Sequence, residues 1–431
     1  MRRRSGALLI SLLVSACGGS SGSPASPDGP APDIGIDAPL ADAPADADAG
    51  ADVGSDGAAD ARADADPCGA PSTTWATCAV DPVAQAGFLQ PDGRYELSIG
   101  DPDVQFDPTA KLWRAWWSTG LAKRYADPPQ LGIKVAESPD GVAWTVQPAP
   151  AILASTDVAD WDASKLETPT VLIVPSNPAA SRYLLYYSGA PVAEKTINGA
   201  SIPWYQIGLA VSPDGKTFTR IPASASPYGK AGLVLQGADV FPGLAGVVDG
   251  LVADPEIVFD GTTFHLFFSS AAVDKSRTAL AFGVAHATST DGIHWTATAG
   301  NPIATLNGSK GPSVVRDATG HWEMYFQRDT AADLASVPSA FNPQLGIWRS
   351  TSTDLTTWTA PGATRELTWD GSDPLQKYGW IAVGDMTLVN GEHRYYVPAF
   401  SALAPPDSGW VVPTKGGFVP SRIVLDLFRR R

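Results

Sequence analysis

The chain has 431 residues, of which 45 are acidic and 30 are basic, and its formal net charge is −15 at pH 7. Much of the excess acid lies in an N-terminal stretch. The rest is only mildly acidic and has no basic stripe of the kind that binds nucleic acid. Three cysteines without a CxxC pair exclude a dithiol redox centre and a cysteine-rich zinc site.

The first 17 residues, MRRRSGALLISLLVSAC, predict a bacterial lipoprotein signal peptide. Three arginines precede a mainly apolar run from Ala7 to Val14, which is far shorter than the ~20 residues that a membrane-spanning helix needs. The small residues before Cys17 resemble a lipobox, after which Cys17 would carry lipid and become the mature N-terminus. The alternative is an ordinary signal peptide that is cut near Ala16.

Residues 18–67 predict a disordered tether. This stretch holds eleven Asp and one Arg among Ala, Gly, Pro and Ser, and it has no aromatic residue. Such a segment cannot bury enough apolar surface to offset the entropy of ordering it. Signal and tether together predict a protein held by lipid alone at a bacterial cell surface. Gly18 after the lipidated cysteine resembles the usual signal for the outer membrane.

Residues 68–94 form a cysteine-bracketed segment between the tether and the folded part. Cys68 and Cys78 remain as a pair once Cys17 carries lipid. Because exported proteins meet an oxidising compartment, these two cysteines are predicted to form a disulfide.

From residue 95 to 431, three sub-patterns recur in a fixed order. A polar or acidic stretch leads into a β-branched strand, an aromatic strand follows, and a third strand ends in a Ser-x-Asp corner. The strand heads lie 57 to 86 residues apart, at Pro102, Pro169, Pro255, Pro312 and Met386. Short strands without a 3.6-residue apolar period predict an all-β fold. Five such units predict a five-bladed β-propeller.

The corner has the form Ser-x-Asp-Gly-x-x-Trp, as in STDGIHW at residues 289–295, and it occurs four times with small changes. Asp and Gly are turn formers, and the aromatic residue begins the next strand. We therefore predict a structural role, as hairpin residues, for Asp140, Asp214, Asp291 and Asp354.

Acidic residues head the predicted first strands, which line the central channel of a propeller. They are Asp101, Asp103, Glu167, Asp254, Glu256 and Asp385. Glycoside hydrolysis needs one protonated and one ionised carboxyl group, and a third carboxylate nearby raises the pKa of the acid. The predicted catalytic residues are Asp101, Glu167 and Asp254. The other three acids are predicted to bind substrate.

The corner after an aromatic strand, together with Asp-Pro at the head of a blade, resembles the five-bladed glycoside hydrolases of families 43, 32 and 68. The resemblance extends over nearly all of residues 95–431. It implies action on O-glycosyl bonds of a poly- or oligosaccharide. It also makes an axial Ca²⁺ possible, for which the sequence offers no ligand set. No other cofactor is expected, and the protein is expected to be a monomer.

Those families place the base or nucleophile as Asp in the first blade, an auxiliary Asp-Pro in the second and the acid Glu-x-Pro in the third. Asp101-Pro102 matches the first position. The other two motifs have changed places, because Glu167-Thr168-Pro169 has the form of the acid and Asp254-Pro255 that of the auxiliary residue. The leading interpretation makes Asp101 base or nucleophile, Glu167 acid and Asp254 auxiliary.

Other interpretations remain open. Glu256 is an alternative acid, and a structural ion pair with Lys310 or Arg316 is the alternative role of Glu167. Separate alternatives are that the propeller binds glycans without cleaving them, or that it serves as an interaction platform with no carbohydrate role.

Aromatic rings offer faces on which sugars stack. Trp116 and Trp117 are therefore predicted to bind substrate, with Trp204 and Trp380 as further candidates. Packing between blades is the alternative for each ring. His286 is predicted to be a hydrogen-bonded core residue.

Overall fold

The computed structural model describes residues 93–124, 127–328, 346–368, 384–389 and 391–401, and it places six strands outside these ranges. The predictions for Cys17, Cys68, Cys78, Trp380 and residues 18–67 lie outside the described residues. Among the described residues, no helix is long and apolar enough to cross a membrane.

The described chain is built of antiparallel strands, which confirms the predicted all-β class. Five sheets have four strands or more. Their innermost strands are β4 (Tyr95–Asp107), β9 (Lys165–Ile173), β16 (Val247–Phe259), β20 (Ser309–Arg316) and β24 (Asp385–Val389). These strands contain the five predicted heads. The second strands are β5 (Leu112–Ala122), β10 (Tyr183–Ala190), β17 (Phe264–Asp274), β21 (Trp322–Arg328) and β25 (Glu392–Ser401).

Each sheet also has a third strand, and several sheets have short edge strands. The third strands are β6 (Gln130–Ser138), β13 (Gln206–Ser212), β18 (Ala279–Ser289), β22 (Gly346–Ser352) and β28 (Arg422–Arg430). The edge strands are β7 (Thr145–Val146), β8 (Ile152–Leu153), β14 (Thr219–Arg220), β15 (Leu233–Leu235), β19 (Thr296–Ala297) and β23 (Leu367–Thr368). Three strands from the N-terminal side also join sheets: β1 (Ala76–Thr77) and β2 (Ala84–Gln85) pair with β28, and β3 (Phe88–Leu89) pairs with β4.

Two hairpins and four short 3₁₀ helices complete the described elements. The hairpins are β11 (Lys195–Ile197) with β12 (Ala200–Ile202), and β26 (Val411–Thr414) with β27 (Gly417–Pro420). The helices are η1 (Ala179–Ser181), η2 (Ala223–Ala225), η3 (Gly237–Asp239) and η4 (Ala304–Leu306).

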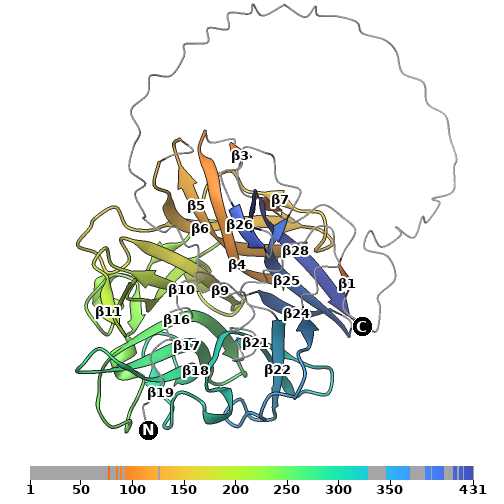
Figure 1. Cartoon of the computed structure of the whole chain (residues 1–431). Coiled ribbons are helices and arrows are strands. Elements are labelled where there is room, and N and C mark those ends of the chain that lie inside the picture. Colours follow the sequence, from red (N-terminus) through yellow and green to blue (C-terminus); the bar gives the residue numbers. More distant parts are fainter. Residues whose placement is uncertain are drawn as a thin grey trace, which may run out of the picture. The chain divides into compact units, whose positions relative to one another are not determined.

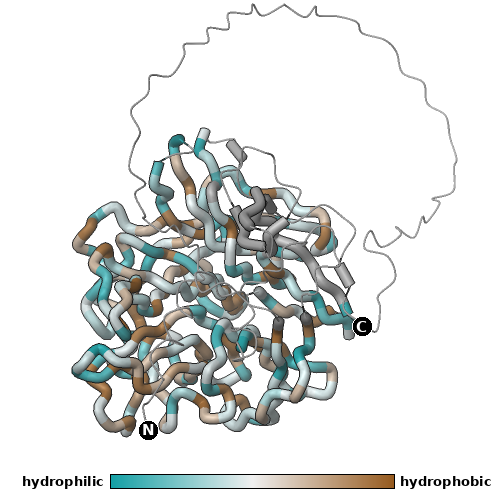
Figure 2. The backbone as a smooth tube through the Cα atoms, viewed as in Figure 1, coloured by the Kyte–Doolittle hydropathy of each residue, from teal (hydrophilic) through white to brown (hydrophobic). Residues whose placement is uncertain are grey.

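The sheets lie in a propeller-like ring (Figure 1). Each inner strand contacts the inner strand of the next sheet, in the order β4, β9, β16, β20, β24 and back to β4. Apolar residues fill the space between neighbouring sheets, and brown segments are distributed over the whole coloured part of the tube in Figure 2. One core cluster, for example, joins Tyr186 of β10 to Phe268 of β17. The core is therefore a set of inter-sheet layers.

The four Ser-x-Asp corners are turns, as predicted. In the first copy, the Asp140 carboxylate accepts the N–H groups of Val142 and Ala143 at 2.8 Å and the hydroxyl of Ser138 at 2.9 Å. The other three copies repeat this pattern.

Three of the corners are also docked onto the preceding sheet. The carbonyl at the glycine position accepts a hydrogen bond from an aromatic side chain of that sheet. The pairs are Trp116 with Gly215 (2.8 Å), Tyr186 with Gly292 (2.8 Å) and Tyr396 with Gly141 (2.9 Å). The repeated corner is thus a joint between neighbouring sheets.

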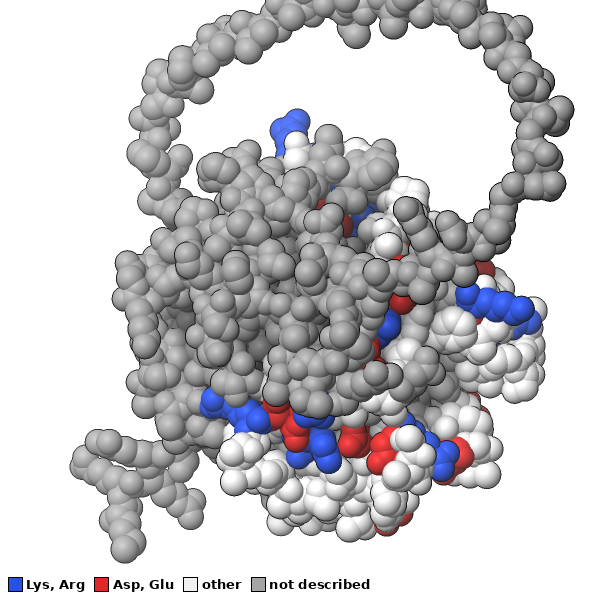
Figure 3. All heavy atoms as spheres, turned by 90° about the vertical axis from the view of Figure 1, so that its right-hand side faces the viewer, with Lys and Arg blue, Asp and Glu red and all other residues white. Residues whose placement is uncertain are grey.

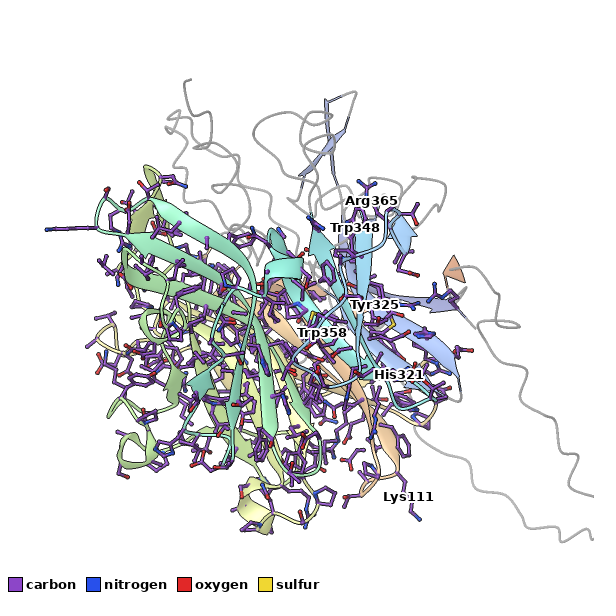
Figure 4. All side chains as sticks on the ribbon, turned by 90° about the horizontal axis from the view of Figure 1, so that it is seen from below. Lys111, His321, Tyr325, Trp348, Trp358 and Arg365 are labelled. Carbon is purple, nitrogen blue, oxygen red and sulfur yellow. The ribbon has the colours of Figure 1, made fainter. Side chains whose placement is uncertain are left out.

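Different side chains lie at the two ends of the fourth sheet. Arg365 lies over the ring of Trp348 at 6.0 Å from its centroid at one end, whereas His321 lies in the turn at the opposite end (Figure 4). On the described part of the face in Figure 3, blue and red side chains are interspersed, so no basic stripe is visible there.

Candidate active site

Four inner strands carry a β-bulge at the same position, where the pairing register with the second strand shifts. The bulge residue precedes a proline, which disfavours the right-handed helical region for it. Its φ is positive in every case: Asp101 (46°), Thr168 (51°), Asp254 (51°) and Gly311 (57°). This conformation costs a non-glycine residue about 1 kcal/mol or more. Bulges of this kind redirect side chains beside active sites.

The bulges surround a pocket with about 300 Å³ of empty space, part of which is open to solvent. Five of its lining residues are acidic, and each was singled out in the sequence: Asp101, Asp103, Asp254, Glu256 and Asp385. The structure therefore brings together five of the six predicted acids, from three distant parts of the chain, and Glu167 is not among the residues that line the pocket.

Three of these acids, Asp103, Glu256 and Asp385, belong to a ring of hydrogen bonds between sheets, which we call the axial ring. In each link a side chain of one inner strand accepts the backbone N–H of the next. The links join Asp103 to Val171, Thr170 to Ile257 (3.3 Å), Glu256 to Val314 (2.8 Å), Ser313 to Met386 (2.9 Å) and Asp385 to Val104 (2.8 Å).

The hydrogen bonds of the axial ring occupy carboxyl oxygens, and burial and the close packing of its acids shift their pKa values. Burial, and then the charge of Asp385, raise the pKa of Asp103 and of Glu256 well above the ordinary value. Burial raises the pKa of Asp385 to about 7, against hydrogen bonds from the Val104 N–H and the Ser313 hydroxyl. Their predicted role in binding substrate stays a prediction, and their ring contacts give them a structural role.

Three serines that the sequence analysis did not single out form a second set of links. The hydroxyl oxygens of Ser118, Ser188 and Ser269 accept the backbone N–H of the next bulge residue at 2.7 to 2.9 Å. Ser118 also donates to the Asp101 carboxyl at 3.3 Å, and Ser269 donates to that of Asp254 at 2.6 Å. Their sequence signal is a serine directly after two aromatic residues in the second strand.

Glu167 lies one residue before the bulge of β9 and is fully buried. Lys165 places its ammonium group 3.2 Å from one carboxyl oxygen, and the Tyr205 hydroxyl donates to the other at 2.9 Å. The ion pair considered for Glu167 thus exists, but its partner is Lys165. Arg316 instead donates to the carbonyl of Gly320 in a turn.

The three predicted catalytic acids are close enough to influence each other's ionisation. Burial, followed by the charges of Asp254 and Glu167, raises the pKa of Asp101 well above its ordinary value. Burial also raises the pKa of Glu167, against Lys165 and Tyr205. It raises the pKa of Asp254, against the Ser269 hydroxyl and the charge of Lys310.

The predicted sugar-stacking rings of Trp116 and Trp117 have no exposed surface. Their indole N–H groups donate to the carbonyl of Gly215 and to the carboxylate of Glu96. Both faces of β5 are covered, so the structure does not support the predicted role of either ring in binding substrate. Trp204 is also buried, and the cationic groups of Lys195 and Arg277 lie over its ring.

His286 is buried, as predicted, and takes part in a chain of hydrogen bonds. Its ring nitrogens lie 3.1 Å from His265 Nδ1 and 2.8 Å from the Thr298 hydroxyl. Burial, and then His265, lowers the pKa of His286 to about 3.

The axial Ca²⁺ that the family resemblance makes possible stays a prediction. Among the described residues, no group of three or more His, Cys, Asp or Glu is arranged to hold a metal ion. The carboxylates of the axial ring accept strand N–H groups.

Comparisons with known proteins found similarity in structure alone. No family model matches the chain, and no curated protein matches it. A complex of BT0996 with RGII covers 81% of this chain and 91% of its own, with a TM-score of 0.52 and 12% identity. A protein named glycoside hydrolase gives the same values. A GH130 structure, from a family named for mannoside phosphorylases and containing glycoside hydrolases, has a TM-score of 0.50 at 12% identity and covers 83% and 94%.

These identities are too low to carry an activity, so the likeness concerns the fold. It agrees with the resemblance that the repeats and the Asp-Pro heads imply. By its propeller-like ring of sheets, this chain shares the fold of glycoside hydrolases.

Proposed function

We propose that the protein hydrolyses glycosidic bonds of a poly- or oligosaccharide in the pocket that the bulges surround. The observation that carries the proposal is the group of Asp101, Asp254 and Glu167. The first two line the pocket from strained bulges, and the third lies close enough to raise the pKa of Asp101. A protonated and an ionised carboxyl group in one pocket are the groups that this reaction requires.

The fold of the structural neighbours supports this choice of substrate class. Two neighbours are named as glycoside hydrolases or as members of a family that contains them, and a third is a complex with RGII. Pocket and fold together favour carbohydrate over other ligands. We further propose that the ring has five blades, which the five inner strands and the closed order of their contacts support.

We also propose that the protein is a monomeric lipoprotein of the bacterial cell surface or outer membrane. The support is in the sequence: the lipobox-like residues before Cys17, the acidic tether at 18–67, and the pair Cys68 and Cys78 for a disulfide. A Cys17→Ser variant should then lose lipid and membrane partitioning, as measured by mass spectrometry and detergent partitioning.

The enzymatic proposal is tested with the purified full chain and arabino-, xylo-, fructo- and manno-oligosaccharides. We expect one class to be shortened, with products resolved by anion-exchange chromatography. Asp101→Asn and Asp254→Asn should each lower the rate at least about 10²-fold, the usual scale for a general acid or base. Asp317→Asn, which changes a partly exposed carboxylate in the turn after β20, should keep the rate.

Two results of this test would contradict the enzymatic proposal. Binding of an oligosaccharide without any turnover, measured by calorimetry, would replace the enzyme by a glycan-binding protein. Neither binding nor turnover across the panel would remove the carbohydrate proposal.

A further inference from the structure

We infer that Asp101 is the proton donor of the pocket and Asp254 its ionised partner, while Glu167 is a buried residue, paired with Lys165, that holds the proton on Asp101. The inference rests on the proposed function. It also reverses the roles that the family resemblance implies, in which Asp101 is the base and Glu167 the acid.

The contacts of Glu167 argue against it as the proton donor. One of its oxygens faces the ammonium group of Lys165 at 3.2 Å, and the other accepts the hydroxyl of Tyr205 at 2.9 Å. An ammonium group has no lone pair and cannot accept a proton from a carboxylic acid. Because the Glu167 side chain is also fully buried, its carboxyl group does not reach a substrate in the pocket.

Asp254 has the contacts of an ionised carboxylate. The Ser269 hydroxyl donates to it at 2.6 Å, a short distance of the kind found for bonds to a charged acceptor. Burial raises the pKa of Asp254, and the Ser269 hydrogen bond and the positive charge of Lys310 act against that rise. Asp254 is partly exposed and lines the pocket, so its charge faces a bound sugar.

Asp101 has the opposite environment. Within the described residues, its carboxyl group accepts a single hydrogen bond, which is long at 3.3 Å and comes from Ser118. The negative charges of Asp254 and Glu167 both act on it. Since like charges disfavour a further ionisation, the proton shared among the three acids resides on Asp101. Lys310 lowers the pKa of Asp101 as well as that of Asp254, so it does not decide between them.

The assignment gives a balanced reaction. The Asp101 proton passes to the glycosidic oxygen while the bond between that oxygen and the anomeric carbon breaks, and Asp101 becomes a carboxylate. One molecule of water is consumed. Its hydroxyl group ends on the anomeric carbon, and its remaining proton returns to the carboxylate pair. The Asp254 carboxylate stabilises the positive charge that develops on the sugar ring.

A measurement that needs no substrate tests where the proton resides. Full-length protein labelled with ¹³C-Asp is studied by infrared spectroscopy at neutral pH, where a protonated Asp gives a C=O band that the label separates from Glu. We expect Asp101→Asn to remove part of this band and Asp254→Asn to leave it. Loss of the band in Asp254→Asn and not in Asp101→Asn would overturn the inference.

A kinetic measurement tests the roles directly. Phenyl and 2,4-dinitrophenyl glycosides of arabinose, xylose and mannose differ in their need for a proton on the leaving oxygen. Asp101→Asn should lose at least about 10²-fold on the phenyl glycoside and much less on the dinitrophenyl one. Asp254→Asn should lose activity on both, and thermal unfolding of each variant checks that it is folded.

The outcomes separate this inference from the function on which it rests. Equal losses of Asp101→Asn on both glycosides, or rescue of Asp254→Asn by the better leaving group, overturn the roles while the glycosidase stands. If wild type cleaves no glycoside or oligosaccharide, the proposed function fails, and the infrared result alone decides where the proton lies.

Discussion

Lys310 is a buried cation in β20 whose charge acts on Asp101 and Asp254 of the pocket. It stands directly before the bulge of its strand, as Glu167 does in β9, so equivalent backbone positions carry opposite charges. Neither residue follows from the Asp-Pro pattern itself. The charge of the pocket is thus set by the residue before each bulge as well as by the bulge residue.

Removing the charge of Lys310 should change the pH dependence of catalysis. Because Lys310 lowers the pKa of Asp101 and Asp254, Lys310→Met raises both. Asp254 must be ionised to act, so the acidic limb of the kcat/KM profile should move to higher pH, with an at least several-fold loss at pH 5. Lys230→Met, at an exposed position, serves as the control. An unchanged acidic limb would show that Lys310 does not act on the reacting acids.

At the level of single residues, the sequence predicts some of the pocket residues and not others. Asp101 and Asp254 were found because an acid before proline at a strand head is a local pattern. Ser118, Ser188 and Ser269 were missed because their role depends on a neighbouring sheet. The tryptophans of β5 were misjudged because both faces of that strand are covered, which the sequence of one strand does not reveal.

Among the elements, the Ser-x-Asp corner must adopt a positive φ after the aspartate, and in one copy the same residue must also fill a space between sheets. Three copies have glycine after the aspartate, at φ of 71° to 77°, and the fourth has Leu355 at 61°. Leu355 is 2% exposed and packs with Trp358 and Phe267. In that corner the backbone strain is tolerated because the side chain fills the space between two sheets.

Leu355→Gly should lower the free energy of unfolding by about 1 kcal/mol. Burying a leucine contributes about 1.5–3 kcal/mol, and relief of the left-handed strain returns about 1 kcal/mol. Leu355→Ala is the matched comparison, since it loses the packing and keeps the strain, and should cost more. Urea denaturation measures both variants. A glycine variant less stable than the alanine variant would contradict this account of the turn.

At the scale of the whole molecule, the axial ring couples folding stability to pH. The pKa of Asp385 is about 7 in the folded protein, against about 3.9 in an unfolded chain. A raised pKa stabilises the fold fully below the unfolded value, and this contribution is lost as pH rises through 7. Asp103 and Glu256 act in the same direction.

Asp385→Asn should therefore flatten the decline in melting temperature between pH 5 and 8. The amide keeps an acceptor for the Val104 N–H but does not ionise. Calorimetry of wild type and variant across this range measures the difference. A decline as steep in the variant as in wild type would place the titrating group elsewhere.

The sequence predicted the class of fold and the positions of the inner strands because both rest on repeated local patterns. It did not predict that β1 and β2 pair with β28, since short strands at opposite ends of a chain share no local signal. Nor did it predict the axial ring. Thr170 and Ser313 accept a strand N–H there just as the three acids do, so the residues of the ring share no residue type that a sequence pattern could reveal.

The composition of the axial ring bears on whether a whole sheet of this chain can be replaced. The donor in every link is a main-chain N–H, and the acceptor is Asp, Thr, Glu or Ser. In the axial ring, a sheet therefore requires of its neighbour only an inner strand at the right height and a side-chain oxygen within reach, whereas the apolar clusters between sheets require matching side chains. The axial contacts are thus compatible with sequence change within a single sheet. We expect a sheet from another protein to be accepted at the first or third position when its apolar side chains match those of its neighbours, and it would bring a new bulge residue to the pocket.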